Sequence, residues 1–155
     1  MFYAIIYLMG TELTQSEINY LLNLEKNYVG TQKYKYPTLG GKLNIQLSSP
    51  DRNEEFILDI TRSHISLTKN TFQNRARGSI ILLRLDLDPA PHRNPDGEII
   101  TGTHLHIYRE GYGDKIAYPL PECFDKCTNA RDFLEKFMDY CHIMNKPVIE
   151  EDLFI

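Results

Sequence analysis

The sequence predicts an α+β domain: a single antiparallel, meander-like sheet packed against an N-terminal and a C-terminal helix. Near both ends of the chain, apolar residues recur every three or four positions, which is typical of amphipathic helices. Between them, apolar and polar residues alternate, as they do in half-buried strands. The length of 155 residues suits one core, so we expect residues 1–155 to form a single domain.

The first helix is expected to begin after Thr14, which forms a capping-box pattern with Glu17. Its apolar stripe runs from Ile18 to Tyr28, and Gly30 is expected to end the helix. The apolar segment before it, residues 1–9, suggests a first strand or a lead-in to the helix. That segment lacks a basic flank, a cleavage site and the length to cross a membrane, so we expect neither secretion nor membrane association.

The expected strands lie between the two helices. By their alternation they are Leu43–Leu47, Phe56–Ile60, Ile65–Leu67, Ser79–Asp88, Thr103–Arg109 and a short final strand, Ile116–Leu120. Ser79–Asp88 has the strongest pattern, and we expect Thr103–Arg109 to pair antiparallel beside it. This pairing places Arg84 and Asp86 on the same face as His104 and His106.

The second helix is expected to start at Asn129, followed three residues later by Asp132. Its buried stripe should consist of Phe133, Leu134, Phe137, Met138 and Cys141. The chain has three cysteines, an odd number, and we expect reduced thiols in a cytoplasmic protein.

The residues Thr-His-Leu-His-Ile-Tyr, 103–108, are the most informative in the chain. In a strand, alternation sends His104, His106 and Tyr108 to one face and Leu105 and Ile107 to the other. The two imidazoles would then lie about 6.5 to 7 Å apart on a polar face. One phosphate, carboxylate or metal ion fits between them.

The turn-forming stretch 91–97 adds His92 and Arg93 at the approach to this strand. Imidazoles and guanidinium groups together suit metal-free cleavage of RNA, which needs an acid, a base and cations for the phosphate. The candidate catalytic residues are His104 and His106 as acid and base, with His92 beside them. The candidate substrate-binding residues are Arg84, Arg93 and Arg109 for phosphate and Tyr108 for stacking a base.

Two other interpretations of the same residues stay open. Polar residues on the open face of a sheet alternate with core residues as a matter of course, and a His-x-His pair there need have no function. Alternatively, His104 and His106 bind a divalent metal ion, with His92, Asp86 or Asp88 completing the coordination sphere. Because no strong metal-binding spacing is present, we assign neither a metal nor a cofactor.

The charges are unevenly distributed along the chain. Residues 61–95 contain six cations and two acids, whereas residues 120–155 contain four cations and eight acids. The net charge of −4 argues against a protein that coats nucleic acid along a broad basic face. A small anion-binding site remains compatible with this composition.

The stretch from Arg84 to Pro119 carries a resemblance. Its Pro-His-Arg-Asn-Pro-Asp-Gly turn and its His-Leu-His-Ile-Tyr-Arg-Glu-Gly-Tyr-Gly-Asp-Lys run resemble a family of small, uncharacterised prokaryotic and mobile-element proteins, a domain of unknown function. A strand that ends in Asp, a Pro-His turn and a His-x-His strand are also similar to the small ribonuclease toxins of toxin–antitoxin modules. Those toxins commonly carry a second His in the turn, where this chain has Arg93. The resemblance implies a bacterial or phage protein of a conflict system.

A separate element, His64-Ile65-Ser66-Leu67, resembles one of the two His-containing motifs of the two-histidine phosphoesterases. The second motif would have to be His104-Leu105-His106-Ile107, where a His replaces the hydroxyl residue. The two elements are 40 residues apart, a shorter separation than that pseudo-symmetric fold requires.

The sequence therefore supports two hypotheses of function. The first is a metal-independent ribonuclease of the toxin type, with RNA as its substrate. The second is a non-enzymatic binding protein, such as an antitoxin, anti-defence or host-takeover factor, that engages a cognate protein through acidic residues such as Glu150, Glu151 and Asp152. Self-association as a homo-oligomer is open under both.

Overall fold

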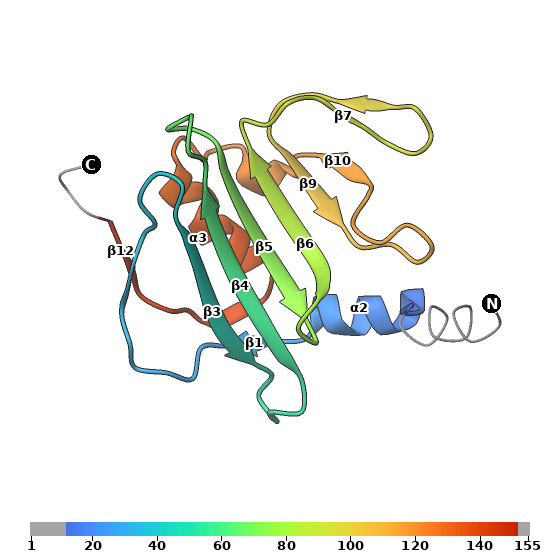
Figure 1. Cartoon of the computed structure of the whole chain (residues 1–155). Helices are drawn as coiled ribbons and strands as arrows, with labels where there is room; N and C mark the ends of the chain where they lie inside the picture. The colour runs from blue at the N-terminus through green and yellow to red at the C-terminus, as the bar shows by residue number, and fades with distance from the viewer. Residues whose placement is uncertain (1–11, 152–155) are drawn as a thin grey trace, which may run out of the picture.

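The computed structural model describes residues 12–151 and confirms the α+β class (Figure 1). Its helices are α2 (Gln15–Asn23), α3 (Ala130–Tyr140) and the 3-10 helix η1 (Glu122–Phe124). The main sheet has eight strands in the order β10-β9-β6-β5-β4-β3-β1-β11. Their bounds are β1 (Lys26–Asn27), β3 (Lys42–Ser48), β4 (Glu55–Arg62), β5 (Asn70–Ala76), β6 (Ile80–Leu87), β9 (His104–Ile107), β10 (Ala117–Pro119) and β11 (Ile143–Asn145).

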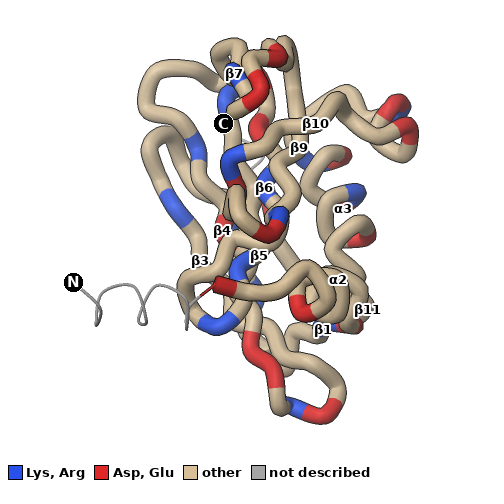
Figure 2. The backbone as a smooth tube through the Cα atoms, turned by 90° about the vertical axis from the view of Figure 1, so that its right-hand side faces the viewer, with Lys and Arg blue, Asp and Glu red and all other residues tan. Residues whose placement is uncertain are grey.

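The two faces of this sheet differ in chemistry. One face is apolar and packs against α2 and α3, which lie together on one side of the sheet in Figure 2. The other face carries a polar row that crosses five strands in register, Asn44–Asp59–Gln73–Arg84–His106. Alternation along each strand separates the two faces.

Both helix starts follow the predicted capping. Thr14 and Glu17 form the capping box of α2, and the Asn129 side chain accepts from the backbone N–H of Asp132 at the start of α3. Leu134, Phe137 and Met138 of the predicted stripe are buried, as is Cys141 just after the helix.

The first helix is shorter than predicted, and the sheet is not a simple meander. Strands β3 to β6 do form an antiparallel meander, but β1 pairs in parallel with β11 and makes the sheet mixed. Helix α2 ends at Asn23 because the backbone from Lys26 onward bonds to β11 instead. The buried Nζ of Lys26 also donates to the carbonyl oxygens of Leu24 and Cys141, at 2.8 and 2.9 Å. Tertiary pairing thus overrides the helical pattern that continues to Tyr28.

The strand predicted at Ile65–Leu67 is wrong. These residues lie in a loop in which Ile65 is 97% exposed and Leu67 is 66% exposed. The strand is instead β5, whose sequence Asn-Thr-Phe-Gln-Asn-Arg-Ala lacks a clear apolar alternation. It still alternates in burial, because Asn70 and Asn74 lie on the buried side with Phe72.

Two small sheets complete the structure. Strand β2 (Tyr34–Lys35) pairs with β12 (Ile149–Glu150), and β7 (His92–Arg93) pairs with β8 (Ile99–Ile100) as a hairpin beside β9 and β10 (Figure 1). Within residues 12–151, no helix is long and apolar enough to span a membrane. The expectation for residues 1–9 lies outside the described part, and the single domain over residues 1–155 stays a prediction.

Candidate functional site

The predicted pairing of the histidine strand is present. Strand β9 lies antiparallel to β6, with His104 opposite Asp86 and His106 opposite Arg84. Directly opposed residues of paired strands point to the same face, so these four side chains converge. Leu105, between the two histidines, points to the other face and is fully buried in the core.

The two histidines of β9 are buried in the folded protein. His104 is 2% exposed and His106 is 1% exposed, although they lie on the polar face of the sheet. The 91–100 hairpin and the loop before β10 fold over them: the His92 ring lies 4.8 Å from that of His106, centroid to centroid. Backbone oxygens of Gly102 and Asp114 accept hydrogen bonds from the two rings. A sequence pattern gives the face of a strand but not what covers that face.

The hydrogen bonds define which ring nitrogens carry protons. The Nδ1 of His104 lies 3.0 Å from the carbonyl oxygen of Gly102, and the Nδ1 of His106 lies 2.8 Å from that of Asp114. A carbonyl oxygen only accepts, so both Nδ1 atoms carry hydrogen. In the neutral rings, both Nε2 atoms then present lone pairs.

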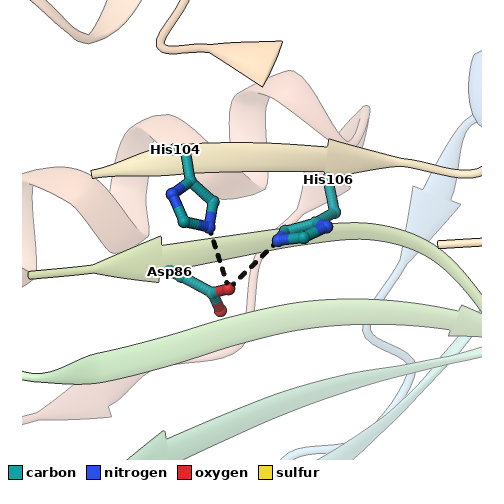
Figure 3. Close-up of side chains that lie close together, drawn as sticks. All are labelled: Asp86, His104 and His106. Carbon is teal, nitrogen blue, oxygen red and sulfur yellow. Dashed lines mark ion pairs between the residues drawn. The ribbon is translucent and has the colours of Figure 1, made fainter. Parts of the chain in front are cut away.

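These two lone pairs converge on a single carboxylate. The Oδ2 of Asp86 lies 3.4 Å from Nε2 of His104 and 3.3 Å from Nε2 of His106 (Figure 3). Within residues 12–151, this is the one group of three potential metal ligands whose donor atoms lie within 4.8 Å of one another. Acceptor atoms that face one another need a donor or a cation between them, and Arg84 supplies N–H donors to two of the three, Asp86 and Nε2 of His106.

Arg84 lies beside this group and has three partners of its own. Its guanidinium donates to Asp86 at 3.3 Å, to Asp114 at 2.7 Å and to Nε2 of His106 at 3.1 Å. Because Arg has no acceptor atom, the last contact requires a lone pair on His106. The carboxylates already hold Arg84, so the expected role of this residue in binding phosphate is not supported by its contacts.

Burial and charge shift the titration of the cluster. Burial would raise the pKa of Asp86, but the neighbouring His106 and the charge of Arg84 outweigh it and lower the pKa. Burial is the main cause that lowers the pKa of His104, and the neighbouring His106 adds to it. The cluster therefore favours an ionised carboxylate beside a neutral His104.

Other predicted site residues lie elsewhere. Arg93 is exposed in the β7–β8 hairpin, and Arg109 is exposed with its guanidinium 3.5 Å from the Tyr118 hydroxyl. Tyr108 is half-buried and packs against the core cluster instead of the histidines. His64 is exposed in the loop after β4.

The structure adds two residues that the sequence did not suggest. Asp114 supplies both a carboxylate to Arg84 and a carbonyl to His106. The buried carboxamide of Asn94 bonds to both the N–H and the carbonyl of Ala117 in β10, each at 2.8 Å, and holds the hairpin on the sheet. Nothing in the turns that contain these residues distinguishes them from ordinary turn residues.

Fold and site together define an α+β domain with a buried His/Asp cluster beneath a hairpin. A family model described as "Family of unknown function (DUF6978)" matches residues 13–143, and the chain belongs to that family. No curated protein matches the chain, and neither does any solved structure.

Proposed function

We propose that Asp86, His104 and His106 bind a divalent transition-metal ion and that the domain is a metal-dependent enzyme. The observation that supports this most directly is the convergence of two imidazole lone pairs on one carboxylate oxygen, at 3.3 and 3.4 Å. In a tetrahedral site with bonds of about 2.0 to 2.1 Å, neighbouring ligand atoms lie about 3.3 to 3.4 Å apart. Both pairs already have the separation of two ligands on one ion.

The second layer of contacts supports the same proposal. Metal-binding histidines usually donate the other ring N–H to a carbonyl or carboxylate, which fixes the orientation of the ring. His104 and His106 both do so, to the carbonyl oxygens of Gly102 and Asp114. An isolated polar cluster has no such need to aim both remaining lone pairs at one point.

The charge of the cluster also favours a cation. Arg84 contributes one positive charge, Asp86 and Asp114 contribute two negative charges, and neutral imidazoles contribute none, which leaves a formal charge of −1. An anion would be repelled by this arrangement, whereas a divalent ion would be attracted. The sequence favoured an anion site because it placed Asp86 near Arg84 but did not show that Asp86 and Asp114 both engage this guanidinium.

Three protein ligands suggest a catalytic rather than a structural ion. Structural zinc sites have four protein ligands, whereas catalytic zinc sites have three and leave a position for the substrate. Two histidines and one carboxylate also form the ligand set of non-haem iron enzymes. When bound, such an ion supplies Lewis-acid chemistry to an oxygen atom of the substrate.

The metal-free ribonuclease stays a prediction and ranks second on geometry. A general acid and base must come within hydrogen-bond reach of the groups that exchange protons. With 2% and 1% exposure, His104 and His106 offer little access to a polymer unless the hairpin moves.

Metal content tests the proposal. Protein produced in medium supplemented with zinc, iron and manganese, then dialysed, is expected to retain about one transition-metal ion per chain by mass spectrometry. The variant His104→Ala should retain less than about a tenth of that, because a first ligand is lost. His64→Ala is the matched control, since His64 is an exposed loop histidine, and should bind as the wild type does.

Two results would contradict the proposed metal centre. A wild-type protein that holds no ion after incubation with excess zinc, iron or manganese would overturn the metal proposal. Cleavage of single-stranded RNA in the presence of EDTA, lost in His106→Ala, would establish the metal-free ribonuclease in its place.

A different surface favours a third candidate function, a non-enzymatic binding protein. The loop that carries Ile65 and Leu67 exposes both apolar side chains at one end of the sheet. Exposed apolar groups that are close together often mark protein contacts. If the cellular effect of expression is lost in the double variant Ile65→Ser, Leu67→Ser and kept in His104→Ala, the binding protein is the better description.

A further inference from the structure

His92 follows the same hydrogen-bond pattern as the two histidines of β9. Its Nε2 lies 2.8 Å from the carbonyl oxygen of Lys115, so Nε2 carries the hydrogen and Nδ1 presents the lone pair. All three rings are therefore anchored through one nitrogen by a backbone carbonyl. Each leaves its second nitrogen for another partner.

The three rings form one group. The centroid of the His92 ring lies 4.8 Å from that of His106 and 5.8 Å from that of His104, and the latter two are 4.9 Å apart. No side chain or backbone group among residues 12–151 forms a hydrogen bond with Nδ1 of His92. The third imidazole ring thus lies next to the pair that we propose as metal ligands.

The hairpin that carries His92 is attached to residues 115–117 by the side chains of both His92 and Asn94. The carboxamide of Asn94 pairs with the backbone of Ala117, two residues beyond the carbonyl that accepts from His92. The segment that contains the hairpin is bounded by Asp88 and Gly102, which both have positive φ angles, 53° and 73°. These positions mark sharp changes of backbone direction at both ends of the segment.

We propose that His92 is a third imidazole ligand, provided by the β7–β8 hairpin through Nδ1. This inference rests on the proposed metal centre. The donor atoms that lie within 4.8 Å of one another belong to Asp86, His104 and His106, so coordination by His92 requires the hairpin to come closer to the pair than it lies in this structure. With His92 bound, the ion has four protein ligands and its coordination sphere is complete. With the hairpin raised, the ion has three protein ligands and one coordination position is available to a substrate.

Cobalt substitution tests this role of His92. The metal-free protein is titrated with Co²⁺, whose visible absorption is strong in four-coordinate sites and weak at higher coordination numbers. The wild type is expected to give the strong spectrum, and His92→Ala a shifted spectrum, because water replaces an imidazole, with an affinity about 10- to 100-fold lower. Arg93→Ala, the adjacent exposed residue of the same hairpin, is the matched control and should leave both unchanged.

A second variant separates coordination from folding. Asn94→Ala keeps His92 but removes one attachment of the hairpin, so it should retain about one ion per chain and lose it to EDTA at least about 10-fold faster than the wild type. An unchanged rate of loss would contradict the role of the hairpin.

The two proposals fail in different ways. If the wild type binds no Co²⁺, the metal centre itself is wrong. If the wild type and His92→Ala bind Co²⁺ with the same spectrum and affinity, the centre stands and His92 is not a ligand.

Discussion

A buried carboxylate, Asp59, and a partly buried one, Asp86, lie on the same face of the sheet, and their surroundings differ in one decisive respect. Asp59 in β4 accepts from two nitrogens of Arg75, at 2.5 and 3.0 Å, from Gln73 at 2.7 Å and from Asn44. Four donors meet the two oxygens of this carboxylate. Its hydrogen-bonding capacity is filled by the protein itself.

Asp86 in β6 is surrounded by acceptors as well as donors. Arg84 donates to it, but the Nε2 atoms of His104 and His106 face it with lone pairs. The comparison shows how a structural carboxylate differs from one available to a ligand: the first has as many donors as it can use, and the second has Arg84 as its donor and also faces the acceptor Nε2 of His104.

The largest expected difference between the two carboxylates is in metal affinity. Asp86→Asn removes a proposed ligand and its charge, and should weaken Zn²⁺ binding by more than about 100-fold. Asp59→Asn makes the same change at a carboxylate with no free lone pair and should leave the affinity within about twofold of the wild type. Competition with a chromogenic chelator measures both. Equal losses in the two variants would contradict the comparison.

The loss in the free energy of unfolding should be larger for Asp59→Asn than for Asp86→Asn, the opposite of the order expected for metal affinity. Asp59→Asn places an amide group against the donors of Arg75, Gln73 and Asn44, and should lower the free energy of unfolding by about 2 to 3 kcal/mol. In metal-free protein, the amide introduced by Asp86→Asn can donate to the lone pair of His104, so the loss should be below about 1 kcal/mol. Urea unfolding followed by circular dichroism compares the variants. A larger loss for Asp86→Asn would show that its carboxylate is mainly structural.

The pH dependence of the free energy of unfolding tests the state of His104, the histidine that faces Asp86 but has no counterpart beside Asp59. The pKa of His104 in the folded protein lies below its ordinary value of 6.5, with burial as the main cause. Between these two pKa values the unfolded chain binds more protons than the folded one, so metal-free protein should lose stability as pH falls below about 6.5. His104→Ala should make the free energy of unfolding between pH 7.5 and pH 5.5 less dependent on pH. A decrease of the same size in this variant would assign the pH dependence to other groups.

The smallest effect is expected at Gln73, which lies in register between Asp59 and Arg84. Gln73→Leu removes one donor to Asp59 and should cost about 1 kcal/mol, because the other donors remain. Zn²⁺ affinity should not change. A loss of affinity in this variant would mean that the two carboxylate clusters are coupled across the sheet.

The sequence predicted those parts of the fold that depend on local rules. The capping residues Thr14 and Asn129 mark real helix starts, and the alternation in β6 and β9 gave their faces and their pairing correctly. The prediction from sequence was wrong where contacts between distant segments determine the structure. The parallel pairing of β1 with β11 ended α2 early, and β5 is a polar strand whose burial depends on its neighbours.

The site was predictable to a similar extent. Two-residue periodicity and strand pairing place His104, His106, Arg84 and Asp86 together, because these rules act within two adjacent strands. The burial of His104 and His106 and the ion pair of Arg84 with Asp114 depend on turns. No short-range sequence pattern specifies the path of these turns. Asp114 and Asn94 lie in such turns, and for this reason the sequence suggested an open anion site where the structure has a covered, acceptor-rich one.

The contact between Asn94 and Ala117 also affects how the edge of the main sheet can pair with other molecules. Strand β10 ends the main sheet, and the outward N–H and carbonyl of Ala117 would be open to strand addition by another molecule if Asn94 did not occupy them. Natural β-proteins commonly protect such borders with charges, bulges or covering loops. Here a single carboxamide imitates one rung of a neighbouring strand and blocks strand addition at Ala117, next to the strand that carries the two histidines of the proposed centre.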